Sequence, residues 1–182
     1  MKKLIVTAIT FGLVLFFGFF SSSAVQAAEP TFKDVPANAE YYAAVEYLAQ
    51  RGIISTSSDY FNPQGKVTRG QLSKMMALST SLNTNNVTNP GFSDVKTTHE
   101  FYPYIAGLVK ENVLSGYPDG SFGINKPVKR SHMAKFIALG FKLPDRALYA
   151  NTFTDLTPNT ETFDSATRLR FYNITVVTLV IM

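Results

Sequence analysis

The chain has 182 residues, contains no cysteine and no tryptophan, and carries a formal net charge of +4. Without cysteine it has no disulfide, no thiol nucleophile and no thiolate metal site. The charge is too small and too mixed to indicate nucleic-acid binding, and no basic run favours it.

The first 27 residues have the layout of a secretory signal peptide. Lys2 and Lys3 precede an apolar run from Leu4 to Phe20, and small residues follow up to Ala27. We expect cleavage after Ala27, so that the chain touches a membrane only through this segment before cleavage. The alternative is a retained membrane anchor, for which the apolar run is at the short limit.

An internal repeat organises the remaining sequence. Three strings place an aliphatic residue directly after Phe-x-Asp, and their Phe residues are 60 and 61 positions apart; they begin at Phe32, Phe92 and Phe153. A fixed period of this kind indicates stacked supersecondary units. We therefore predict an all-α fold of tandem helix–loop–helix repeats: repeat 1 at 30–83, repeat 2 at 91–143 and a partial repeat 3 at 152–182, with linkers at 84–90 and 144–151.

Each repeat begins with an expected amphipathic helix. Apolar residues recur at helical spacing, and a residue type that ends helices in the left-handed conformation follows. The stripe residues are Tyr42, Val45 and Leu48 in repeat 1, and Tyr102, Ile105 and Leu108 in repeat 2; the helix-ending residues are Gly52 and Asn112.

A second helix is expected from Thr68 to about Leu82 in repeat 1 and from Arg130 to about Gly140 in repeat 2. Thr68 and Gln71 have the spacing of a capping box. Arg69 and Arg130 fall in the first helical turn, beside backbone N–H groups that have no partner within the helix. A fixed cation beside such donors predicts a site for an anion.

Repeat 3 begins like the other two, with Phe163, Ala166 and Leu169 at the spacing of a first helix. The apolar, β-branched residues 175–182 then stand where a loop and a second helix are expected. We interpret this segment as a truncated or frame-shifted repeat.

Taken together, these motifs resemble the S-layer homology family over Thr31 to about Asn173. They are Phe-x-Asp-Val, the first-helix aromatic residue, the loop from Gly116 to Phe122 and the arginine-bearing start of the second helix. The resemblance implies a pseudo-threefold helical bundle. It also implies non-covalent anchoring to a secondary cell-wall polysaccharide, attached to peptidoglycan in Gram-positive envelopes and often carrying a pyruvate ketal. The Thr-Arg-Ala-Glu motif of the S-layer homology family corresponds in this sequence to Thr68–Gln71 and Lys129–His132.

The resemblance and the helix-start argument together give a set of candidate carbohydrate-binding residues. For the aspartates the alternative is a loop-supporting role, for the tyrosines core packing, and for the arginines a solvated or acid-paired position. The candidates are Arg69, Arg130, Thr68, Asp34, Asp94, Tyr42, Tyr102 and Gly116.

We therefore predict a secreted, wall-bound carbohydrate-binding module at the cell surface, with no catalytic residue, cofactor or metal. The sequence contains no nucleophile elbow, phosphate loop or His-Glu-x-x-His motif. The alternatives are a fragment of a larger wall-associated hydrolase or S-layer protein, and a structural module whose repeats pair with other copies.

Overall fold

The computed structural model describes residues 29–144, 156 and 160–174. The chain divides after Pro30, and the part described below belongs to the unit Thr31–Met182. The predicted signal peptide and the apolar segment at 175–182 lie outside the described residues.

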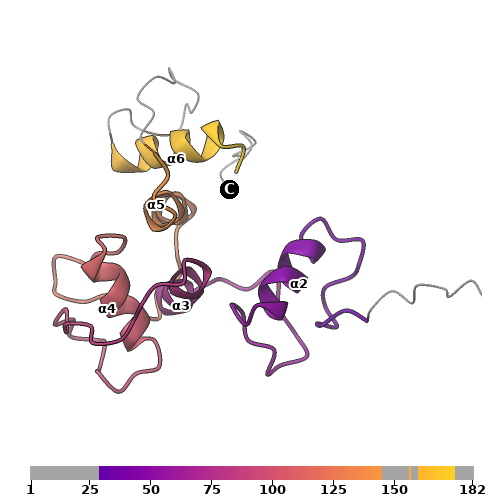
Figure 1. The fold of residues 1–182 in the computed structure, drawn as a ribbon, viewed down its shortest axis with the longest axis horizontal. Helices are drawn as coiled ribbons and strands as arrows, with labels where there is room; N and C mark the ends of the chain where they lie inside the picture. Colours follow the sequence, from indigo (N-terminus) through magenta and orange to yellow (C-terminus); the bar gives the residue numbers. More distant parts are fainter. Residues whose placement is uncertain (1–28, 145–155, 157–159, 175–182) are drawn as a thin grey trace, which may run out of the picture. The chain divides into compact units, whose positions relative to one another are not determined.

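The described residues contain five helices and no strand (Figure 1). They are α2 (Tyr42–Gln50), α3 (Arg69–Ser79), α4 (Tyr102–Lys110), α5 (Arg130–Gly140) and α6 (Glu161–Phe171). The predicted repeat 1 contains α2 and α3, the predicted repeat 2 contains α4 and α5, and α6 lies in the predicted partial repeat 3. The predicted all-α, helix–loop–helix organisation is confirmed for this part of the chain.

Helix ends follow local sequence signals. Gly52 and Asn112 adopt φ values of 65° and 58°, which confirms the predicted left-handed residues after α2 and α4. The helix α3 is shorter than its predicted range because Ser81 is also left-handed, at φ 51°, and the Leu82 N–H turns back to the Ala77 carbonyl. That closure satisfies a carbonyl at the end of the helix.

The helices pack across the boundaries between repeats. The second helix of one repeat lies against the first helix of the next, so α3 packs on α4 and α5 packs on α6, while α3 also contacts α5. One apolar core is built around Leu72 and Met76 of α3, Ile105 of α4, Phe136 of α5 and the loop residue Phe122.

Repeat 1 has a separate small core. It consists of Phe32, Val35, Val45 and Ala49, with half-buried neighbours such as Phe61 packed against it. This core joins α2 to the segments that precede and follow it.

Candidate functional site

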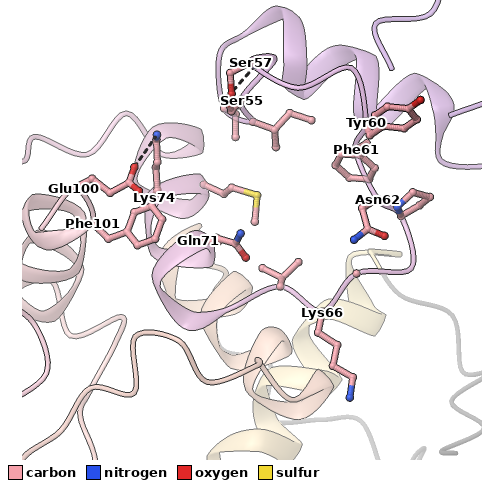
Figure 2. A pocket seen from close by; sticks show the side chains of 16 residues that line it. Ser55, Ser57, Tyr60, Phe61, Asn62, Lys66, Gln71, Lys74, Glu100 and Phe101 are labelled. Carbon is pink, nitrogen blue, oxygen red and sulfur yellow. Dashed lines mark hydrogen bonds and ion pairs between the residues drawn. The ribbon is translucent and has the colours of Figure 1, made fainter. Parts of the chain in front are cut away.

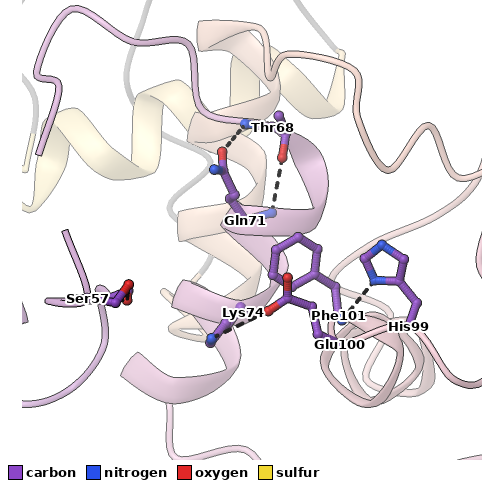
Figure 3. A network of polar contacts seen from close by, with 8 residues as sticks. Ser57, Thr68, Gln71, Lys74, His99, Glu100 and Phe101 are labelled. Atoms are coloured by element: carbon purple, nitrogen blue, oxygen red, sulfur yellow. Dashed lines mark hydrogen bonds and ion pairs between the residues drawn. The ribbon is translucent and has the colours of Figure 1, made fainter.

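The helix α3 begins with the predicted capping box. The Gln71 N–H donates to Thr68 Oγ1 at 3.3 Å, and the Thr68 N–H donates to Gln71 Oε1 at 2.9 Å (Figure 3). Two backbone donors near the helix start are therefore satisfied by side chains. The Thr68 hydroxyl oxygen and backbone N–H are thus both hydrogen-bonded within the protein.

Arg69 follows the cap and is buried, with 5% of its surface exposed. Its Nε donates to the Phe122 carbonyl at 2.8 Å and its NH2 group to the Ser115 carbonyl at 2.7 Å. The guanidinium carbon also lies 4.4 Å from the Phe122 ring centre and 5.0 Å from that of Tyr117. Burial lowers the pKa of Arg69, but a guanidinium stays charged at neutral pH. This geometry favours a role in joining repeat 1 to the loop of repeat 2.

The start of α5 has the same motif in different surroundings. Arg130 is exposed, and Lys129, at the cap position, makes no side-chain capping bond. The N–H groups of Arg69 and Gly70 on α3 donate to carbonyls of residues 126 and 124, at 3.0 and 2.9 Å. Among the described residues, the corresponding N–H groups on α5 have no such acceptor. Within the described part of the chain, this helix start therefore has N–H donors without an acceptor as well as an exposed guanidinium.

Further positive charge surrounds this helix start. Lys126 and Lys129 are exposed, and the first turn of α5 contains no acidic residue. Burial first, and then the charges of Arg69 and two lysines, lower the pKa of His132. His132 therefore favours its neutral form, and the charge of the site comes from Arg130 and the lysines.

Both candidate aspartates support loops. The Asp94 carboxylate accepts N–H bonds from Phe122, Gly123 and Ile124 at 2.7–3.0 Å. Asp34 in repeat 1 similarly accepts two backbone N–H bonds, from residues 61 and 62. Burial alone would raise the pKa of Asp94, but the three backbone donors together lower it.

The remaining candidates also lie against other parts of the protein. Tyr42 and Tyr102 are half-buried and pack on the cores of repeats 1 and 2, respectively. A methyl group added to Gly116 would collide with the ring of Phe92. Of the eight predicted residues, seven pack or bond within the protein, and Arg130 is exposed, its side chain making no hydrogen bond or ion pair with another described residue.

A cavity of about 550 Å³ lies between the loop of repeat 1 and α3 (Figure 2). The side-chain amides of Asn62 and Gln71 point into it from opposite sides. An ion pair of 3.9 Å between Lys74 and Glu100 lies on its wall (Figures 2 and 3). None of the eight predicted residues lines this cavity.

The sequence analysis did not find the cavity because its walls come from three separate segments. The sequence features that could have pointed to the cavity were Lys66 and Lys74, which flank the capping box, and the exposed ring of Tyr60. Each is an ordinary surface residue when read alone.

The described residues offer no group of three or more side chains that could hold a metal ion. His99 uses its Nδ1 to accept the Phe101 N–H at 3.1 Å (Figure 3). Within the same part of the chain, no helix is long and apolar enough to cross a membrane.

The S-layer homology domain model matches residues 31–73 and 91–134. The chain therefore belongs to the S-layer homology family, and both matched regions begin at a Phe-x-Asp-Val string and extend past the arginine-bearing helix start.

A protein named as a cell wall amidase and several named as S-layer proteins are similar to this chain. The chain is 34% identical to an uncharacterized cell wall amidase of Bacillus anthracis over 67% of its own length and 22% of the amidase. It is 31% identical to the S-layer protein sap of Bacillus anthracis, and 30% identical to an S-layer protein of Bacillus thuringiensis subsp. finitimus. Each S-layer match covers 74% of this chain and 17% or 16% of the relative.

The chain thus spans about a fifth of the length of these relatives or less. The family and the relatives support attachment to the cell wall as the general role of this region.

Proposed function

We propose that the protein attaches non-covalently to the bacterial cell wall by binding an anionic secondary polysaccharide at the start of α5. The observation that carries this proposal is the exposed Arg130 at a helix start without a side-chain cap. Lys126 and Lys129, which closely precede Arg130 in the sequence, add positive charge, part of which Asp119 offsets near Lys126.

A carboxylate is the chemical group that this arrangement suits best. A guanidinium can donate two parallel hydrogen bonds to a carboxylate, which an ammonium group cannot reproduce. The free N–H groups and the positive end of the helix dipole favour the same negative charge. A pyruvate ketal on a wall sugar presents such a carboxylate, so a pyruvylated polysaccharide is the ligand that we propose.

The other candidate residues act indirectly in this proposal. Arg69 and Asp94 fix the loop of repeat 2, which contains Tyr117. The Lys126 ammonium lies 4.2 Å from the centre of the Tyr117 ring. By fixing this loop, Arg69 and Asp94 therefore position the Tyr117 ring against which the Lys126 ammonium lies.

The test is co-sedimentation of the purified protein with isolated cell walls. Three wall preparations are compared: intact walls, walls stripped of secondary polysaccharide, and walls that keep the polysaccharide but lack its ketal. We expect binding to intact walls, and strong loss of binding to both others. Equal binding to intact and stripped walls would overturn the proposal. Equal binding to walls with and without the ketal would show that the pyruvate carboxylate is not the group that the protein binds.

A second comparison locates the site on the protein. Arg130→Ala should weaken binding to intact walls roughly ten- to a hundredfold, which corresponds to one charged hydrogen-bonding group. Arg130→Lys should restore only part of this loss, because the bidentate contact is missing. Lys110→Ala is the matched control, since it removes one exposed charge at the C-terminal end of α4. Wild-type affinity in Arg130→Ala would place the site elsewhere.

A further inference from the structure

The loops of repeats 1 and 2, residues 55–61 and 115–122, have the same construction. Phe32 and Phe61 pack with ring centres 5.6 Å apart, and Phe92 and Phe122 pack at 5.4 Å. Behind each phenylalanine pair, an aspartate carboxylate holds the backbone N–H groups at the end of the loop. The two loops are therefore anchored in the same way at their C-terminal ends, although the loop of repeat 1 is one residue shorter.

In repeat 2 this surface binds a guanidinium. Arg69 donates to the carbonyls of Ser115 and Phe122, and its guanidinium carbon lies 5.6 Å from the centre of the Phe136 ring. The repeat alignment assigns one counterpart to each of these three residues. The counterparts are Ser55 for Ser115, Phe61 for Phe122 and Met75 for Phe136.

All three counterparts line the cavity of repeat 1. No donor among the described residues reaches the carbonyl of Ser55 or Phe61, and no arginine lines the cavity. Its volume of about 550 Å³ leaves room for an arginine side chain. On its wall, Glu100 offsets the charge of Lys74 (Figure 2). The cavity thus shares three lining positions with the arginine site in repeat 2. It differs in having no aromatic ring at the position of Tyr117 and in the added positive charge of Lys66.

We propose that this cavity is a guanidinium-binding site, and that it takes Arg130 from a second copy of the chain. Arg130 is the sequence counterpart of Arg69 and is exposed at a helix start that has no side-chain cap. The proposed contact between two copies would repeat a contact that the chain already makes within itself, between Arg69 at the start of α3 and the loop of repeat 2.

The geometry also sets the form of the association. The helix α6 already packs on α5, so the second copy is bound through the first turn of α5 rather than along the whole helix. Such a contact is small and therefore weak and concentration-dependent. Two different surfaces meet, so each copy can bind one copy through its cavity and another through Arg130, and repetition gives open chains or closed rings of copies.

The inference goes beyond glycan binding, although both use Arg130. It predicts self-association in the absence of any glycan, and it predicts that wall polysaccharide and a second copy compete for α5. The two proposals are separable because Met75 lies in the guanidinium site and not in the proposed glycan site.

The experiment is sedimentation velocity of the full chain over a concentration series without glycan. Met75→Arg places a guanidinium in the cavity from within the chain, and Met75→Leu is the matched control that leaves the site open. We expect Met75→Arg and Arg130→Ala each to weaken self-association roughly ten- to a hundredfold, and Met75→Leu to behave as wild type. Circular dichroism verifies that each variant is folded.

Mixing the two defective variants gives the sharpest result. Arg130→Ala retains an open cavity, and Met75→Arg retains an exposed Arg130, so the mixture should form heterodimers at concentrations where each variant alone is monomeric. Free arginine methyl ester should compete for the cavity and dissociate the copies at lower concentration than lysine methyl ester does at equal ionic strength. A wild-type chain that stays monomeric, or a mixture that fails to pair, would overturn the inference. Met75→Arg should still bind cell walls, so loss of self-association is distinguished from loss of glycan binding.

Discussion

The starts of α3 and α5 carry the same arginine in two different surroundings. At α3 the helix is capped by Thr68 and Gln71, and the Arg69 guanidinium is buried on two carbonyls of the next repeat. At α5 the cap position holds Lys129, and Arg130 is exposed. The arginine of this motif therefore connects two repeats within the protein at α3, whereas at α5 it is exposed to solvent.

The difference teaches that a repeat motif does not have a fixed role. The partner of Arg69 is the loop of the following repeat, and no described residue takes the same position for Arg130. Stacked repeats gain much of their stability from such neighbour contacts. The predictions below test whether the two arginines differ as the geometry requires.

The largest effect is expected from Arg69→Ala. This variant loses two hydrogen bonds from a charged donor and several ring contacts in a buried position. We expect the free energy of unfolding to fall by about 3 kcal/mol, measured by urea denaturation. Arg130→Ala should change it by less than about 0.5 kcal/mol, because an exposed side chain is removed. Equal losses in the two variants would contradict the distinction.

A smaller effect is expected from exchanging the caps. Thr68→Ala removes the side-chain acceptor for the Gln71 N–H and should destabilise the protein by about 1 kcal/mol. Lys129→Thr gives α5 a capping residue that it lacks and should stabilise by a few tenths to about 1 kcal/mol. Thermal unfolding of both variants measures the two changes. A loss of stability in Lys129→Thr would show that the cap position of α5 is already satisfied.

The smallest effect is a dependence of stability on acid. The folded protein lowers the pKa of Asp94, so this carboxylate stabilises the fold above its unfolded pKa, and the contribution is lost as the pH falls through the folded pKa. We expect unfolding curves between about pH 5 and pH 2 to show this loss. Asp94→Asn should be less stable at neutral pH and should lose less on acidification. An unchanged acid slope in Asp94→Asn would exclude this carboxylate as the source.

Much of the fold follows from signals that lie close together in the sequence. The cap of α3 depends on two residues three positions apart, and the ends of α2 and α4 depend on one left-handed residue each. These features were predictable because neighbouring residues determine them. The packing of α5 on α6 crosses a repeat boundary and required the structure.

The site was only partly predictable. The burial of Arg69 depends on Ser115 and Phe122, which are 46 and 53 residues away, and no local pattern reports such distances. The sequence therefore assigned the same role to Arg69 and Arg130. The cavity of repeat 1 was missed for the same reason, because Phe61 and Met75 meet it from separate segments.

The most direct test of the account is the dissociation constant of a soluble, pyruvylated fragment of wall polysaccharide, measured by calorimetry on wild type and Arg130→Ala. Protein concentrations are kept below the range of self-association. The account predicts that Arg130→Ala binds roughly ten- to a hundredfold more weakly, and that added salt weakens the wild type more than the variant. Equal affinity and equal salt dependence in the two proteins would contradict the central claim that the start of α5 binds the anionic glycan.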